Sequence, residues 1–173
     1  MLNHMVGVFR LSPKTFEEVE YSKSATGQAA IIVAGVALLS ALRNGTLASG
    51  SEERFLTGYF LTTLVWTFIS WLFWAMITYL IGTALSGSKA TFKGMLRVIG
   101  FAYTPLVLSV IPCAGWLVGA LWSLASGFVA VRQSFEMDNL KAAMTILAGF
   151  AVYVAGSLLL GFLVGRTLPL ISF

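Results

Sequence analysis

Hydroxyl, small and aromatic side chains form the stripe in this chain whose spacing could carry a function. Steps of three and four residues place them on one face of a helix: Thr63, Thr67, Ser70, Trp74, Thr78 and Gly82. Small and hydroxyl residues let helices approach closely and form interhelical hydrogen bonds worth about 0.6 kcal/mol each. Close helix packing is therefore the simplest interpretation of this stripe.

Tryptophans near the middle of the same stretch suggest other interpretations. Trp66, Trp71 and Trp74 lie there, whereas Trp in membrane helices is enriched at the interfaces. Aromatic surfaces of this size must contact another helix, a lipid tail or a bound ligand. A groove for an apolar ligand, such as a lipid or a carotenoid pigment, is one alternative to packing. A polar path for a small-molecule permease or channel is another.

Acids and bases are missing from the middle of every apolar stretch. Buried ionisable groups mark proton relays and ion paths in membrane proteins, so ion-coupled transport is disfavoured. The single Cys113 and the single His4 exclude an intrachain disulfide and make a zinc site implausible. Glu17, Glu18 and Glu20 lie outside the apolar stretches, where we expect solvated charges. We therefore predict a protein that is no enzyme and needs no cofactor.

The composition is that of a membrane protein. Hydrophobic residues make up 58% of the 173 residues and charged residues only 10%, against about 25% charged in ordinary soluble domains. The net charge of +4 comes from Lys and Arg that are spread thinly along the chain. Such spacing makes no patch that would neutralise several phosphates, so we expect no nucleic acid partner.

Charged residues divide the apolar part of the chain, residues 25–173, into spans. About 20 apolar residues cross a hydrocarbon core of about 30 Å. We predict an all-α integral membrane protein, a five-transmembrane-helix bundle with spans at about 25–42, 57–82, 94–111, 115–131 and 142–165. The turn signal from Pro112 to Gly115 separates the third and fourth spans. A re-entrant pair that never reaches the far side is the alternative for 98–131.

The basic residues predict an orientation for five spans. One side holds eight of the 11 Lys and Arg residues: Arg10, Lys14, Lys23, Lys89, Lys93, Arg97, Arg132 and Lys141. The other side holds Arg43, Arg54 and Arg166. Short loops rich in Lys and Arg stay cytoplasmic. We therefore expect the N-terminus inside and the C-terminus outside.

Residues 1–24 are predicted to form a short amphipathic interfacial segment. Leu2, Met5, Val6 and Phe9 recur at helical spacing. Thr15 and Glu18 have the spacing of a capping box, which predicts a helix starting there.

The third predicted span contains the string Gly100-Phe101-Ala102-Tyr103-Thr104-Pro105. Pro105 removes a backbone donor, so we expect a kink and a freed carbonyl near Phe101 that a hydroxyl or a water satisfies. The string resembles the glycine–aromatic–x–x–x–proline signature of the Yip-one domain family. Leu11 to Phe16, Trp71 to Gly82 and Phe92-Lys93-Gly94 look like its prokaryotic branch.

This resemblance implies five spans with a cytosolic N-terminus, and Gly100, Tyr103 and Pro105 as positions of a shared motif. Eukaryotic members act in vesicle trafficking and bind prenylated GTPases. They carry a longer hydrophilic N-terminal region and an Asp-Leu-x-Gly-Pro element, which this sequence lacks, and this argues against GTPase binding. The leading hypothesis is a non-catalytic scaffold or accessory subunit that binds other membrane proteins. A prokaryotic plasma membrane is expected, with the Golgi or endoplasmic reticulum as the alternative.

Overall fold

The described part of the chain is helical throughout. The computed structural model describes residues 1–47, 61–87, 90–111 and 114–167, and the all-α prediction is confirmed for them. The elements are α1 (Leu2–Phe9), α2 (Pro13–Tyr21), α3 (Ala25–Leu47), α5 (Leu61–Ser86), α6 (Phe92–Ala102), the 3-10 helix η2 (Thr104–Val110), α7 (Gly115–Ser134) and α8 (Asn139–Thr167).

Among the described residues, four helices are long and apolar enough to cross a membrane: Ala25–Leu42 in α3, Thr63–Ser86 in α5, Gly115–Ser134 in α7 and Asn139–Gly156 in α8. The predicted spans 25–42, 115–131 and 142–165 coincide with α3, α7 and α8. The span predicted at 57–82 appears as α5, which continues to Ser86, while residues 57–60 lie outside the described part.

The third predicted span, 94–111, is not one continuous α-helix. It consists of α6 and η2, which meet at Tyr103. The 11 residues of α6 rise about 16 Å, about half of a hydrocarbon core. Proline at the start of η2 ends the α-helical hydrogen-bond ladder. Of the predicted turn, Pro112 and Cys113 lie outside the described residues, and α7 begins at Gly115.

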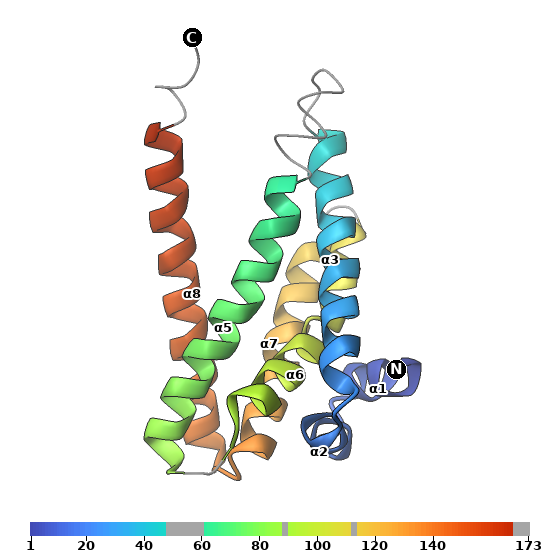
Figure 1. The fold of residues 1–173 in the computed structure, drawn as a ribbon, viewed down its shortest axis with the longest axis vertical. Helices are drawn as coiled ribbons and strands as arrows, with labels where there is room; N and C mark the ends of the chain where they lie inside the picture. Colours follow the sequence, from blue (N-terminus) through green and yellow to red (C-terminus); the bar gives the residue numbers. More distant parts are fainter. Residues whose placement is uncertain (48–60, 88–89, 112–113, 168–173) are drawn as a thin grey trace.

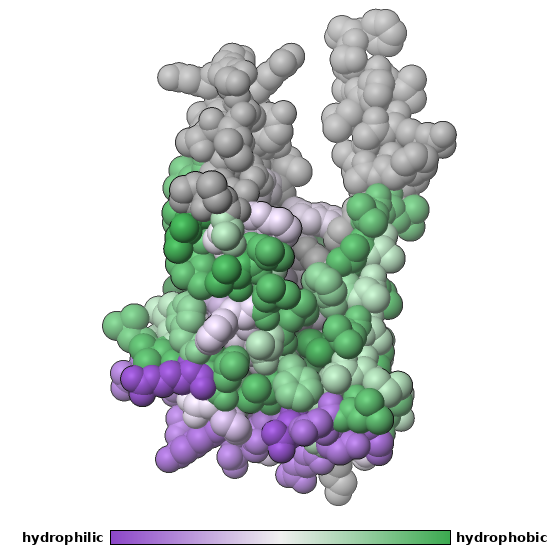
Figure 2. Space-filling model, turned by 180° about the vertical axis from the view of Figure 1, so that it is seen from behind, coloured by the Kyte–Doolittle hydropathy of each residue, from purple (hydrophilic) through white to green (hydrophobic). Residues whose placement is uncertain are grey.

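Helices α3, α5, α6, α7 and α8 pack together as a bundle (Figure 1). Helix α5 packs against α3, α6 and α8, and α7 packs against α6, η2 and α8. The N-terminal helices, the end of α5, the start of α6 and the connection from α7 to α8 lie at one end of the bundle, the base (Figure 1). Hydrophilic residues gather at this base and apolar residues cover the surface above it (Figure 2). This partition is the one a bilayer imposes on a helical bundle.

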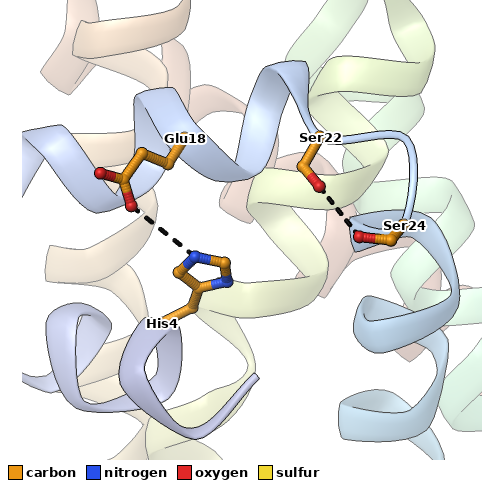
Figure 3. Close-up of polar contacts among 4 residues, drawn as sticks. All are labelled: His4, Glu18, Ser22 and Ser24. Atoms are coloured by element: carbon orange, nitrogen blue, oxygen red, sulfur yellow. Dashed lines mark hydrogen bonds and ion pairs between the residues drawn. The ribbon is translucent and has the colours of Figure 1, made fainter.

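The N-terminal segment forms two helices, α1 and α2. His4 of α1 lies 3.7 Å from the Glu18 carboxylate of α2, and the hydroxyls of Ser22 and Ser24 lie 3.0 Å apart at the turn into α3 (Figure 3). The capping box predicted at Thr15 is wrong. Helix α2 begins at Pro13, because proline is well suited to the first helical position, and Thr15 is a buried residue inside the helix.

Candidate functional site

A cavity of about 340 Å³ lies within the bundle, in the half remote from the N-terminal helices. Three tryptophans and several hydroxyl side chains dominate its wall. The lining residues are Val36, Ser40, Trp66, Thr67, Ser70, Trp74, Tyr103, Leu106, Ser109, Trp116, Ala120, Ser123, Leu124 and Phe150. A volume above about 300 Å³ and a wall that combines apolar and aromatic surface with polar groups are typical of small-molecule pockets.

The floor of the cavity comes from α5 and the helix break. Ser70 and Trp74 are 4% and 6% exposed. The ring of Tyr103 packs against the Trp74 indole at a centroid distance of 5.7 Å. The Ser70 hydroxyl has no hydrogen-bond partner among the described residues. A buried hydroxyl without a partner is costly, so it marks the place where a ligand atom would gain most.

The Trp74 indole nitrogen lies towards Gly149 of α8. A Cβ built at Gly149 of α8 would lie 3.7 Å from Nε1 of Trp74 and 3.0 Å from the Thr78 hydroxyl. Both polar atoms are buried and have no hydrogen-bond partner within the described ranges. Gly149 thus allows α8 to approach α5 closely, and Trp74 lines the cavity with its aromatic ring.

The rim of the cavity is open to the surroundings of the bundle. Trp116 at the start of α7 is 53% exposed, and Trp66 and Thr67 are partly exposed. The Thr67 hydroxyl donates to the Thr63 carbonyl at 2.8 Å, which satisfies it within its own helix. The opening is therefore mainly apolar and aromatic, and the free hydroxyl of Ser70 lies behind it.

The predicted stripe on the second span divides in two. Trp66, Thr67, Ser70 and Trp74 line the cavity, whereas Thr63 and Thr78 do not. Beyond the cavity, Gly82 lies against the ring of Phe135. Trp71, also near the middle of α5, donates its indole N–H to the Leu96 carbonyl at 3.1 Å and so joins α5 to α6.

The three motif residues of the third span have different positions. Tyr103 lines the cavity. A Cβ on Gly100 would lie 2.7 Å from Cβ of Ala29 and 3.0 Å from the Trp71 indole nitrogen, so only glycine fits this crossing of α6, α3 and α5. Pro105 lies opposite Gly119, where a Cβ would lie 2.9 Å from the Pro105 carbonyl oxygen. Gly100 and Pro105 thus position Tyr103.

A model of the Yip1 domain matches residues 6–163. The chain belongs to the Yip1 domain family. The match runs from the second half of α1 to most of α8 and includes every residue that lines the cavity. No curated protein and no solved structure matches the chain. Yip1 membership and the apolar helices make this a membrane protein embedded in a lipid bilayer.

Part of the cavity wall and the burial of one charged residue do not follow from local patterns in the sequence. Ser109, Trp116 and Ser123 come from η2 and α7, and the spacing within α5 carries no signal for them. Glu20 was expected to be solvated, but it is only 8% exposed because α2 packs against α6 and α7. Within the described residues, no group of three or more His, Cys, Asp or Glu could hold a metal ion.

Proposed function

We propose that this Yip1-family chain is a non-catalytic membrane protein that holds an apolar ligand with one hydrogen-bonding group in the cavity beside α5. The observation that carries the proposal is the buried hydroxyl of Ser70 without a partner, on the floor of a cavity with three tryptophans. Aromatic faces bind apolar chains through their large surfaces. Ser70 would bind a carbonyl or hydroxyl oxygen of a lipid, an isoprenoid or a pigment.

Extraction and mass spectrometry of the purified protein test this proposal. Thr67 and Thr83 provide a matched pair, since both hydroxyls donate to the carbonyl four residues earlier on α5. Only Thr67 lines the cavity. Thr67→Leu should reduce the amount of co-purified apolar molecule several-fold, and Thr83→Leu should leave it unchanged. Equal amounts in both variants, or no organic molecule in the wild type, would count against the ligand.

A scaffold or accessory subunit is the second candidate. Leu158 and Leu159 near the end of α8 are 70% and 59% exposed, and α8 diverges from α5 towards its C-terminal end (Figure 1). A further helix from another subunit would bury this face. Extraction in a mild detergent should then yield a stable complex. A chain that always emerges alone and monodisperse would exclude this role.

A permeation path is tested through the same cavity. A permease predicts that water reaches Thr67 and Ser70, whereas an apolar ligand site predicts that it does not. A water-soluble maleimide should leave Thr67→Cys and Ser70→Cys unmodified in a Cys113→Ala background. Rapid labelling of both positions would favour the permease.

For the topology we propose five crossings of a prokaryotic plasma membrane, with α6 and η2 together as the third. Support comes from three basic residues: Arg10 at the end of α1, Lys14 in α2 and Arg132 in the last turn of α7. The N-terminal helices and the connection from α7 to α8 lie at the base (Figure 1), and short basic loops stay cytoplasmic. In the same Cys113→Ala background, an impermeant maleimide applied to intact cells should modify Ser51→Cys and spare Lys141→Cys. Modification of Lys141→Cys would reverse the orientation, and labelling of both would require another number of crossings.

A further inference from the structure

A second cavity, of about 710 Å³, lies at the base of the bundle, where hydrophilic residues gather (Figure 2). Helices α2, α5, α6 and α7 contribute to its wall. Its wall carries charges of both signs: Glu20 and Glu136 are acidic, and Lys23 and Arg97 are basic. This arrangement differs from the aromatic cavity beside α5, so the two cavities suit different chemical groups.

Arg97 is held in place without being neutralised. Its Nε donates to the Thr26 hydroxyl at 2.7 Å, and its Nη1 donates to the Glu20 carbonyl oxygen at 2.8 Å. Both acceptors are neutral. A guanidinium carries five N–H donors in a planar fork, so these two contacts orient the group and leave further donors for an anion. Planar recognition of phosphate is a common use of such a pre-oriented arginine.

Glu20 is the complementary group. Its side chain is almost fully buried, and the described residues contain one ion pair, His4 with Glu18, which does not involve it. Burial raises the pKa of Glu20. The Ser134 hydroxyl and the Arg97 guanidinium oppose this rise, and the carboxylates of Glu17 and Glu136 add to it. A cationic partner at the carboxylate would restore the charged form.

Helix α6 closes one side of Glu20, and the cavity that Glu20 lines is where that partner would lie. A Cβ on Gly94 would lie 2.9 Å from Cγ of Glu20 and 3.3 Å from its Oε1, so α6 packs closely against this side chain. The hydroxyl of Ser134, a buried residue of the same wall, lies beside the Glu20 carboxylate and lowers its pKa, and its oxygen keeps lone pairs that can accept. Ser134 therefore offers a second acceptor for an ammonium group next to the carboxylate.

Glu20 and Arg97 thus present opposite charges to one cavity without pairing with each other. We propose that this cavity binds the zwitterionic head group of a phosphatidylethanolamine-type lipid, with the phosphate at Arg97 and the ammonium at Glu20 and Ser134. A primary ammonium can donate hydrogen bonds to the Glu20 carboxylate and to the Ser134 hydroxyl oxygen. A quaternary ammonium has no N–H group and cannot do so. Lys23 lies on the same wall and adds positive charge for the phosphate. The base of the bundle carries the hydrophilic band, where lipid head groups would lie.

Native mass spectrometry of the full chain, titrated with defined lipids, tests this proposal. The wild type should bind phosphatidylethanolamine about tenfold or more tightly than phosphatidylcholine and phosphatidylglycerol, since an unpaired buried charge costs more than one factor of ten. Glu20→Gln should abolish this preference and keep the shape of the side chain. Glu17→Gln removes the same charge from an exposed position of α2 and should keep the preference.

Four results would overturn the proposal. They are an undiminished phosphatidylethanolamine preference in Glu20→Gln, equal binding of the choline lipid, tighter binding of the anionic lipid, and loss of the preference in Glu17→Gln. Soluble phosphoethanolamine separates the two sources of this head group. A thermal shift as large as that given by the lipid would identify the free compound as the ligand and overturn the lipid assignment. Unfolding midpoints of both variants show whether they are folded.

Discussion

The hydroxyl of Ser123 on α7 donates a hydrogen bond of 2.7 Å to the carbonyl oxygen of Ala102, the last residue of α6. Both residues are buried. A proline-induced break leaves helix carbonyls without their usual partners, which is costly in a membrane. The Ser123 hydroxyl, on the neighbouring helix α7, therefore supplies a donor for a carbonyl at the break. Since Ser123 also lines the cavity beside α5, the break and the cavity depend on the same contact.

Ser123→Ala should destabilise the bundle by about 1 kcal/mol, because it leaves the Ala102 carbonyl without this donor. Ser126 on the same helix provides the matched control. It is also buried, but its hydroxyl has no partner among the described residues, so Ser126→Ala should change stability little or raise it. Thermal unfolding midpoints in detergent measure both. Equal loss in the two variants would show that the Ser123 bond contributes nothing specific.

Gly100→Ala should destabilise the protein by about 1–3 kcal/mol, because the added methyl group overlaps Ala29 and Trp71 at the crossing of α6, α3 and α5. Gly35 on α3 is the control, since a Cβ there meets nothing within 4 Å. Gly35→Ala should be neutral or stabilising, as alanine favours helices. Denaturation of the purified variants gives both values. A harmless Gly100→Ala would mean that the crossing has room to relax.

The spans could be predicted from local sequence because hydropathy acts within about 20 residues. Helices α3, α7 and α8 and the break near Pro105 follow from apolar runs and one proline. Pro105 predicts a kink and a freed carbonyl near Phe101, with a hydroxyl or a water as its partner. In the structure the chain changes to a 3-10 helix after Tyr103, and the Ser123 hydroxyl donates to the carbonyl of Ala102, one residue beyond Phe101. Helix α7 carries Ser123, so the packing of α7 decides which carbonyl receives the hydrogen bond.

The sites were less predictable because each gathers residues far apart in the chain. Trp66, Ser70 and Trp74 share a face of α5 and could be singled out, but Trp116 closes the same cavity from α7. The burial of Glu20 depends on how α2 packs against α6 and α7. No periodicity within residues 1–24 contains this information. Local patterns therefore predict one wall of a membrane site, and tertiary packing supplies the others.

Glu136, which follows α7, has a φ of 49°, in the left-handed region that favours glycine. Glu136→Gly should stabilise the chain by about 1 kcal/mol relative to Glu136→Ala. Both variants remove the carboxylate near Glu20. The difference in stability between them therefore reports the cost of the left-handed backbone at residue 136. Unfolding midpoints at one pH measure it. If the alanine variant is the more stable of the two, the left-handed conformation is not a source of strain.

Glu20→Gln should change how stability depends on pH. Burial raises the folded-state pKa of Glu20 above 4.5, its ordinary value, so the folded chain keeps the proton longer than the unfolded chain does. Its stabilising contribution is fully present below about pH 4.5 and is lost as the pH rises through the raised value. In lipid-free detergent the wild type should therefore lose stability over this range. Glu20→Gln does not titrate there and should lack that loss, so at neutral pH it should melt at a higher temperature. Glu17→Gln, at an exposed position of the same helix, should retain the loss, since it leaves the buried carboxyl in place. Parallel pH profiles for the wild type and Glu20→Gln would show that the Glu20 carboxyl is solvated in solution.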